Sequence, residues 1–194
     1  DYTITGYQQA QGDQYAALYS ETVTVQLEND FLPFLYPNQY VNFTPDSKAS
    51  QLALSLIDED TVDVDALQQI YDYVVSNLTY DYEKADTVTT GYLPDVDETL
   101  KTGTGICFDY AALTTAMLRS CDIPCKLQIG YAGDIKHAWI DVYIRSKGWV
   151  NQAVSFKGDT WTLMDPTFDS NSDDKEAIQD YIGDESNYTV QFTR

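Results

Sequence analysis

The chain has 194 residues, with 11 Lys and Arg against 31 Asp and Glu, so its formal net charge is −20. Nucleic-acid binding depends on clustered Lys and Arg that neutralise phosphates, so this charge excludes it. The charge also opposes docking on an anionic membrane surface. A hydrophobic content of 43% is typical of a globular domain, and no apolar run approaches the roughly 20 residues that span a bilayer.

The composition also bears on where the protein works. The chain opens at Asp1-Tyr2 without Met, as a trimmed product would, and it has 16 Tyr but only 11 Lys and Arg. We therefore expect a secreted or cell-surface protein of bacterial type. Anchoring through a lipid on a segment outside this chain is compatible with that expectation. The length suits one domain with its own core, and we expect a monomer.

Residues 1–60 carry no recognised motif, and we expect them to form an N-terminal extension that packs on a core made by residues 61–194. Within this extension, the residue pattern predicts a helix over 8–19 and a strand over 22–27. It also predicts a helix over 49–57, which follows a polar capping signal.

The next helix is clearer, because apolar residues recur at helical spacing from Asp63, which can cap it, to about Asn77. From Glu83 to Lys101 this period is absent, and we expect a long loop. Loops of this length in compact domains are often functional.

After a second apolar helical pattern, the periodicity changes to the alternation that is typical of strands. Strands are expected over 126–131, 137–144, 149–154 and 160–164, with a short helix over 174–181 before a polar tail. Because the helices come first and the strands after, the order predicts an α+β fold with a mostly antiparallel sheet.

A Gly-rich turn, Gly103-Thr104-Gly105, runs directly into Cys107 and an apolar helical pattern. This order places Cys107 in the first turn of a helix, where free backbone N–H groups and the positive end of the helix dipole favour a thiolate. A thiolate is a nucleophile, so Cys107 is a candidate catalytic residue. The alternative is a small buried side chain that opens a core helix.

The other two cysteines, Cys121 and Cys125, are four positions apart in the sequence, and a disulfide between them would be strained. We expect both to be packing residues. With one histidine in the chain and no second Cys pair, we expect no zinc site. The acidic turn Asp169–Asp173 begins like a calcium loop, but Asp174 stands where such a loop requires Gly. We therefore expect no metal and no cofactor.

A cysteine nucleophile needs a base, and the base needs an acceptor that orients it. The only histidine, His137, opens a predicted strand, and the start of a central strand can face the N-terminus of a helix packed on the sheet. Asp165 ends a later strand, where it could accept a hydrogen bond from the imidazole and fix its tautomer. The alternatives are a surface-turn or core histidine and an Asp that only forms a turn before Pro166.

Several of these motifs together resemble a known family. They are, in chain order, Tyr71-Asp72-Tyr73-Val74, Tyr80-Asp81-Tyr82, Gly105-Ile106-Cys107-Phe108-Asp109-Tyr110-Ala111, Leu118-Arg119-Ser120, Ile123-Pro124, Gly130-Tyr131, His137-Ala138-Trp139 and Met164-Asp165-Pro166-Thr167. The chain is similar, from about residue 65 to 168, to the transglutaminase-like superfamily, and more narrowly to its bacterial transglutaminase-like domain proteins. The large extra domains of the animal transglutaminases have no room here.

The resemblance implies a papain-like fold, with the nucleophile helix packed on a sheet that bears the histidine and the acid. It implies a Cys107–His137–Asp165 triad within a catalytic domain of residues 61–194. The oxyanion would meet the Cys107 backbone N–H and a second donor, for which Tyr80 is the candidate. A core role for Tyr80 is the alternative. Gly105 would let the substrate approach, and Trp139 would shield the site from water.

The implied chemistry is acyl transfer on a peptide, protein or carboxamide substrate through a thioester. Hydrolysis by water, as in a peptidase or amidase, is slightly favoured over transamidation by an amine, because an open groove admits water. A transglutaminase-like binding or surface-assembly module without catalysis is the alternative. The distance between Cys107 and His137 in the folded protein would distinguish the enzyme from the module without catalysis.

Overall fold

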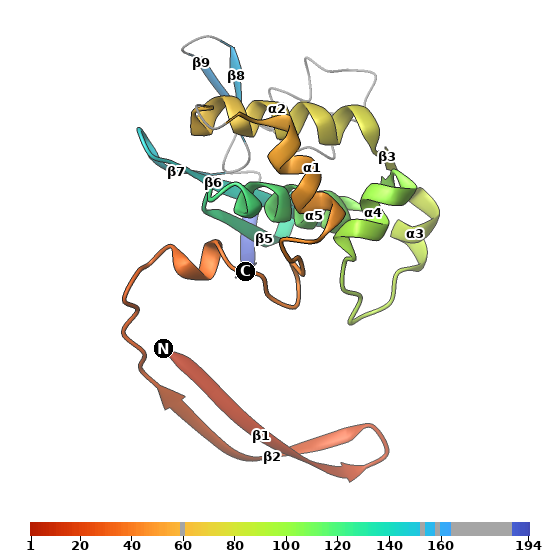
Figure 1. Cartoon of the computed structure of the whole chain (residues 1–194). Coiled ribbons are helices and arrows are strands. Elements are labelled where there is room, and N and C mark those ends of the chain that lie inside the picture. Colours follow the sequence, from red (N-terminus) through yellow and green to blue (C-terminus); the bar gives the residue numbers. More distant parts are fainter. Residues whose placement is uncertain (59–60, 152–153, 158–159, 164–187) are drawn as a thin grey trace. The chain divides into compact units, whose positions relative to one another are not determined.

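The computed structural model (Figure 1) describes residues 1–58, 61–151, 154–157, 160–163 and 188–194. By its internal contacts the chain divides into two compact units, Asp1–Asp30 and Phe31–Arg194. No helix among the described residues is long and apolar enough to cross a membrane.

The first unit is a β-hairpin, so the predicted helix over 8–19 is wrong. Strand β1 (Tyr2–Gln11) pairs antiparallel with β2 (Gln14–Val23). The turn between them uses Gly12 at a φ of +57°, a left-handed conformation that Gly adopts without strain. Aromatic and β-branched residues suit a strand on either side of such a turn, and this signal outweighs the helical spacing of the Gln and Ala residues.

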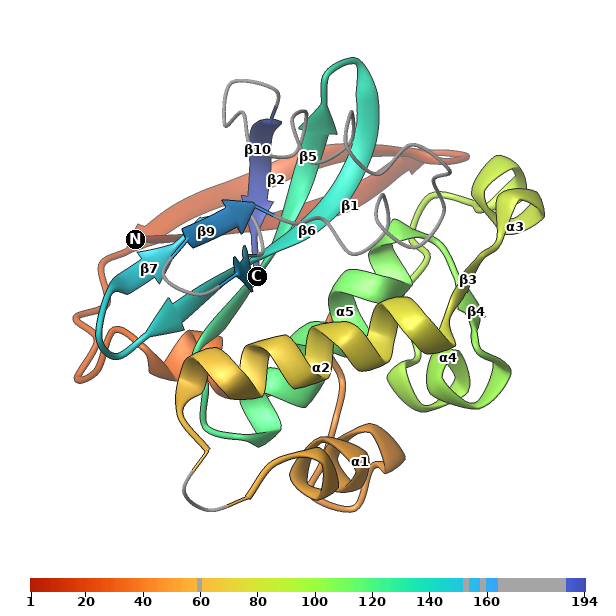
Figure 2. The same ribbon diagram turned by 90° about the horizontal axis from the view of Figure 1, so that it is seen from above.

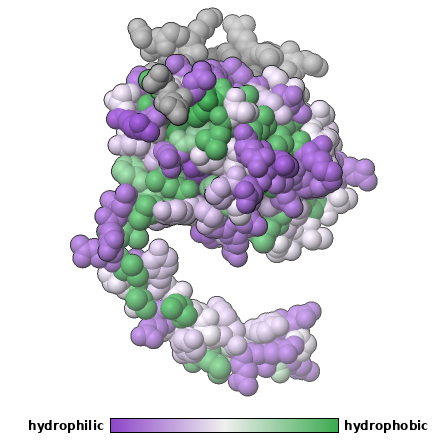
Figure 3. Space-filling view, in the orientation of Figure 1, coloured by the Kyte–Doolittle hydropathy of each residue, from purple (hydrophilic) through white to green (hydrophobic). Residues whose placement is uncertain are grey.

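The two faces of the hairpin differ in polarity. Cross-strand partners share a face, and on one face Thr3 and Thr22 hydroxyls lie 3.1 Å apart while those of Thr5 and Ser20 lie 3.0 Å apart. The other face carries Tyr2, Ile4, Tyr19 and Val23, all of them exposed. Figure 3 shows hydrophobic residues in the open along this segment.

The second unit begins with its helices. In chain order these elements are η1 (Leu32–Phe34), α1 (Lys48–Leu56), α2 (Asp63–Asn77), β3 (Thr79–Tyr80), α3 (Tyr82–Thr87), α4 (Val96–Thr102), β4 (Thr104–Gly105) and α5 (Cys107–Ser120). The helices predicted over 49–57, from Asp63 and from Cys107 are confirmed. The long loop predicted from Glu83 to Lys101 is wrong, because α3 and α4 shorten it to residues 88–95.

The strands follow. They are β5 (Cys125–Ala132), β6 (Ile135–Ile144), β7 (Gly148–Val150), β8 (Val154–Lys157), β9 (Thr160–Leu163) and β10 (Tyr188–Thr193). Four of them form an antiparallel sheet in the order β10-β5-β6-β7, while β8 and β9 pair separately. The α+β prediction with a mostly antiparallel sheet is confirmed. The tail expected to be polar contributes β10, and the predicted helix over 174–181 lies outside the described residues.

Helix α5 is the centre of this unit. Nearly all of its residues are buried, as in a helix surrounded by other elements. It packs against α1, α2 and α4 as well as against β5 and β6, and Figure 2 shows it between the other helices and the sheet. On β6 the alternate residues Ala138, Ile140 and Val142 belong to the core that α5 shares.

The last turn of α5 is held by one buried side chain, that of Arg119. Its Nε and Nη2 donate to the carbonyl of Cys125 at 3.0 and 2.8 Å. Its Nη1 donates to the carbonyl of Tyr36 at 2.7 Å, and Nη2 also donates to that of Arg194 at 3.0 Å. A single guanidinium therefore joins the last turn of α5 to the start of β5, to the segment after η1 and to the last residue of the chain, Arg194.

We predict that Arg119→Lys destabilises the fold by about 2–4 kcal/mol, because one ammonium cannot reach three carbonyls in different directions. Urea unfolding measures the free energy. The matched control is Arg145→Lys, because the Arg145 side chain is 76% exposed in its ion pair with Asp63. That variant should stay within about 0.5 kcal/mol of the unaltered protein. Equal stability of the two variants would contradict the stabilising role of the Arg119 hydrogen bonds.

Candidate active site

Cys107 is the first residue of α5, and Ile106 precedes it in an extended conformation with φ −98° and ψ 174°. The side chain of Cys107 is partly buried and packs against the core. At this position the first-turn N–H groups have no helical carbonyl to bond, and the helix dipole presents its positive end. The structure thus confirms that Cys107 opens a helix.

The approach to Cys107 is fixed by a short parallel pairing. Gly103 ends α4 in a left-handed conformation with φ +65°, after which β4 runs beside β3. Thr79 N–H donates to the carbonyl of Gly103, and Asp81 N–H donates to that of Gly105, both at 2.9 Å. Tyr80 is the strand partner of Gly105, which lies two positions before Cys107. Two residues predicted near the site therefore lie side by side.

A buried carboxylate lies directly behind this turn. Asp109, with a fully buried side chain, accepts from the Ile106 N–H through Oδ2 at 2.8 Å. The same Oδ2 accepts from Lys84 Nζ at 2.7 Å, and Oδ1 accepts from the Tyr92 hydroxyl at 2.5 Å. This is the carboxylate half of a capping box, since Ile106 has no side-chain oxygen to return the bond.

Gly105 is required by the close approach of Asp109. A Cβ added at Gly105 would lie 2.6 Å from the Cβ of Asp109, closer than two carbons can approach without moving the turn. The glycine therefore brings the backbone before Cys107 against the capping carboxylate. Any larger residue would separate the two.

Sequence reasoning missed the roles of Lys84, Tyr92 and Asp109. A signal for Asp109 was present, because a carboxylate at the third position of a helix commonly caps the N–H that precedes the first turn. Nothing local pointed to Lys84 or Tyr92, which come from α3 and from the segment 88–95.

The predicted base, His137, lies near the start of β6 and is buried. Its ring stacks on that of Trp139, with the centroids 6.4 Å apart and an interplanar angle of 17°. Trp139 in turn meets the ring of Tyr188 edge-on at 5.1 Å. Because side chains alternate along a strand, His137 and Trp139 share the face of β6 that lies opposite the core residue Ala138.

The elements that carry Cys107 and His137 are neighbours. The chain reverses at Asp122, which has a φ of +56°, so β5 returns along α5 from the end where Arg119 bonds Cys125. Cys107, at the other end of α5, therefore lies toward the end of the sheet at which β6 begins. His137 pairs with Gly130 at that end. The third predicted residue, Asp165, lies outside the described residues.

The three cysteines are free thiols that differ in surroundings. Burial raises the pKa of the Cys121 thiol to about 11. It raises the pKa of the Cys125 thiol further, to about 12. Both therefore remain protonated near neutral pH. Their burial agrees with the packing roles predicted for them.

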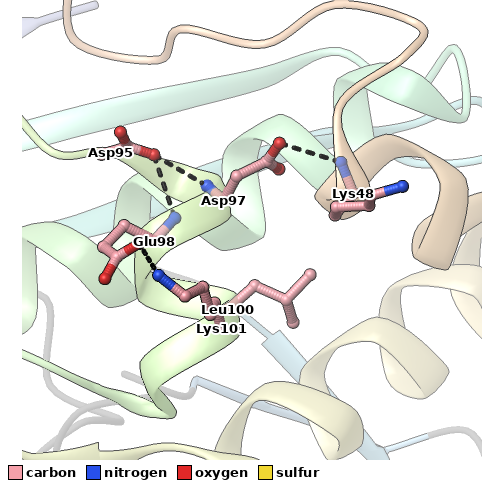
Figure 4. A pocket seen from close by; sticks show the side chains of 6 residues that line it. All are labelled: Lys48, Asp95, Asp97, Glu98, Leu100 and Lys101. Carbon is pink, nitrogen blue, oxygen red and sulfur yellow. Dashed lines mark hydrogen bonds and ion pairs between the residues drawn. The ribbon is translucent and has the colours of Figure 1, made fainter.

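A cavity of about 340 Å³ lies apart from this turn, between α4 and the start of α1 (Figure 4). Two of its carboxylates accept hydrogen bonds from backbone N–H groups, and that of Glu98 pairs with Lys101. Asp95 accepts from the N–H groups of Asp97 and Glu98, and Asp97 accepts from that of Lys48 at 3.0 Å. Within the described ranges, no group of three or more His, Cys, Asp or Glu could hold a metal ion. The acidic turn Asp169–Asp173 lies outside those ranges.

Comparison with known proteins gives relatives of similar fold. One solved structure, named as a "putative cysteine protease" from Cytophaga hutchinsonii, matches with a TM-score of 0.57 and 22% identity over 87% of this chain and 48% of that one. The periplasmic domain of TgpA from Pseudomonas aeruginosa matches with a TM-score of 0.50 and 18% identity over 74% of this chain and 49% of that one.

A curated protein, the UPF0252 protein MJ1282 of Methanocaldococcus jannaschii, is 36% identical over 62 residues, which are 29% of this chain and 18% of that protein. The chain thus spans less than half the length of each of these relatives. The model of the "Transglutaminase-like superfamily" matches residues 50–166, more than half of the 194 residues. The chain belongs to the transglutaminase-like superfamily.

Proposed function

We propose that the protein is a cysteine-dependent enzyme that transfers the acyl group of a peptide, protein or carboxamide substrate through a thioester on Cys107. The observation that carries the proposal is the place of Cys107 as first residue of α5, with its turn fixed by Asp109. Membership of the transglutaminase-like superfamily supports it. So does the likeness in fold to the protein named as a "putative cysteine protease".

The proposed reaction begins with the transfer of the Cys107 thiol proton to His137, whose tautomer Asp165 would fix. The thiolate attacks the substrate carbonyl carbon, and the carbonyl oxygen becomes an oxyanion that accepts from the Cys107 backbone N–H. The Tyr80 hydroxyl is the proposed second donor. When the C–N bond breaks, His137 returns the proton to the leaving amine, and the acyl group remains on sulfur as a thioester.

A second nucleophile then resolves the thioester. Water would give a carboxylic acid, as in a peptidase or amidase, whereas an amine would give a new amide, as in a transamidase. We propose that water is the main acceptor, because it competes at high concentration wherever a groove is open to solvent. In the same proposal Trp139 shields the imidazole, since its ring stacks on that of His137.

One observation favours the alternative, a binding module without catalysis. His137 stacks on Trp139 on the face of β6 opposite the core residue Ala138, which belongs to the core that α5 shares. A base has to come within hydrogen-bond reach of the proton that it takes, directly or through one water, although that distance is often long without substrate. The reactivity of Cys107 therefore separates the two functions.

We further propose that the protein acts outside the cytoplasm, on the cell surface or after secretion, as a monomer. The composition supports this location, since 16 Tyr and a net charge of −20 suit a soluble exported domain. Fractionation of the native host and detection in the surface or medium fraction would test the location.

We predict that iodoacetamide at about pH 7 modifies Cys107 on the order of 100-fold faster than Cys121. A thiol whose pKa burial raises to about 11, as for Cys121, is almost entirely protonated there. Mass spectrometry of the alkylated peptides follows each cysteine separately. His137→Gln should slow Cys107 roughly tenfold, whereas Lys136→Met, on the exposed neighbour of His137, should not. Similar alkylation rates for all three cysteines would overturn the proposal that Cys107 is an activated nucleophile.

We predict that the protein releases the amine from fluorogenic peptide amides and that Cys107→Ala abolishes the release without lowering thermal stability. With an added primary amine, mass spectrometry of the products should show more acid than new amide. A larger amide fraction would assign transamidation instead. If no peptide amide turns over and Cys107 reacts as slowly as Cys121, the module without catalysis is the better description.

A further inference from the structure

Three segments that are distant in sequence meet at the Asp109 carboxylate, two positions after Cys107. Lys84 comes from α3, Tyr92 from the segment 88–95, and the Ile106 N–H from the backbone before α5. We propose that Lys84 and Tyr92 are positioning residues that act through Asp109 to hold the Cys107 turn in its reactive arrangement. This inference rests on the proposed function of Cys107.

The geometry gives the carboxylate a complete set of donors. Oδ2 of Asp109 accepts from Lys84 at 2.7 Å and from the Ile106 N–H at 2.8 Å, and Oδ1 accepts from Tyr92 at 2.5 Å. Lys84 Nζ also lies 2.7 Å from the Tyr92 hydroxyl, which closes the network. Because Asp109 is fully buried, a lost donor leaves a lone pair that water cannot readily reach.

The charges of the network balance. Burial lowers the pKa of Lys84, but its hydrogen bonds to Asp109 and Tyr92 outweigh this, and the net pKa is raised. Burial, together with the bond to Asp109, raises the pKa of Tyr92. Lys84 therefore stays a cation and Tyr92 a neutral donor. Without the Lys84 cation, the Asp109 anion would oppose a second negative charge at the Cys107 sulfur.

The same elements hold the turn from a second direction. Asp81 accepts from the N–H of Lys84 at 2.8 Å and so caps α3, while its own N–H donates to the carbonyl of Gly105 at 2.9 Å. The start of α3 thus bonds the backbone on one side of Cys107, and Lys84 bonds Asp109 on the other. Movement of α3 would shift both.

Tyr92 ties the segment 88–95 to the same place. Its ring meets that of Phe108 edge-on with the centroids 6.3 Å apart, and its hydroxyl bonds Asp109. Phe108 and Asp109 are the two residues that follow Cys107. The segment 88–95, which is the part of the predicted long loop that lies between α3 and α4, is therefore joined to the first turn of α5 by one side chain.

The test uses Lys84→Met and Tyr92→Phe in the full chain, with the rate of Cys107 alkylation by iodoacetamide measured against pH. Lys84→Met should move the pH profile of alkylation to higher pH and slow alkylation near neutral pH roughly five- to tenfold. Tyr92→Phe keeps the ring on Phe108 and should act in the same direction by a smaller factor. Lys84→Arg, which keeps the cation, should restore the pH profile.

Two matched controls remove a Lys ammonium and a Tyr hydroxyl from exposed positions outside the Asp109 network. Lys101→Met removes a cation that pairs with Glu98 at 2.8 Å on the surface, where 74% of its side chain is exposed. Tyr82→Phe removes the hydroxyl of a tyrosine that is 66% exposed. Neither should move the thiol pKa. Limited proteolysis adds an independent readout, since Tyr92→Phe should speed cleavage within 88–95 and Tyr82→Phe should not.

The outcomes separate the two proposals. If the thiol pKa of Cys107 in the unaltered protein is that of an ordinary cysteine, the proposed function and the positioning role are both overturned. If it is lowered, but Lys84→Met and Tyr92→Phe leave it unchanged while thermal stability falls, only the positioning role is overturned. Should Lys84→Met fail to fold, Tyr92→Phe decides the question alone, because it removes a single oxygen.

Discussion

The burial of the Asp109 carboxylate is the constraint on which the candidate site depends. A buried anion is costly unless charge and hydrogen bonds compensate it, and here each compensating donor arrives on a different segment. To satisfy the carboxylate, α3, the segment 88–95 and the backbone before α5 have to meet at one point. Gly105 makes the meeting possible, because a side chain there would collide with Asp109.

Helix α5 is held by different forces along its length. Its middle is apolar and buried among other elements, which fixes its depth but resists sliding and rotation only through shape. Its two ends carry buried charged groups, Asp109 at the first turn and Arg119 at the last. Directional bonds at both ends fix the rotation and register of the helix. The proposed nucleophile, the first residue of this helix, is therefore held in one position, as the proposed catalysis by orientation would require.

What the sequence could predict was set by how local each signal is. The helix at Cys107 follows from a glycine turn and an apolar period inside one stretch. The helix expected over 8–19 failed because the turn at Gly12 and the pairing of β1 with β2 override the helix propensity of Gln and Ala. The loop from Glu83 to Lys101 hides two short helices with little apolar periodicity, although each has a local Asp cap, Asp81 for α3 and Asp95 for α4. The Lys84 contact to Asp109, by contrast, joins residues 25 positions apart, and no local pattern predicts it.

The thiol and its proposed base are placed by different physics. The position of Cys107 follows from a helix start that one carboxylate caps, whereas the position of His137 follows from strand register. Gly130 lies opposite His137, and a Cβ there would overlap the carbonyl of Thr189 and lie 3.0 Å from the Trp139 ring. The missing side chain lets β10 and the Trp139 ring approach the backbone opposite His137. Since the two placements are independent, the proposed mechanism needs both: a helix start that favours the Cys107 thiolate, and a strand register that brings His137 to the thiol proton.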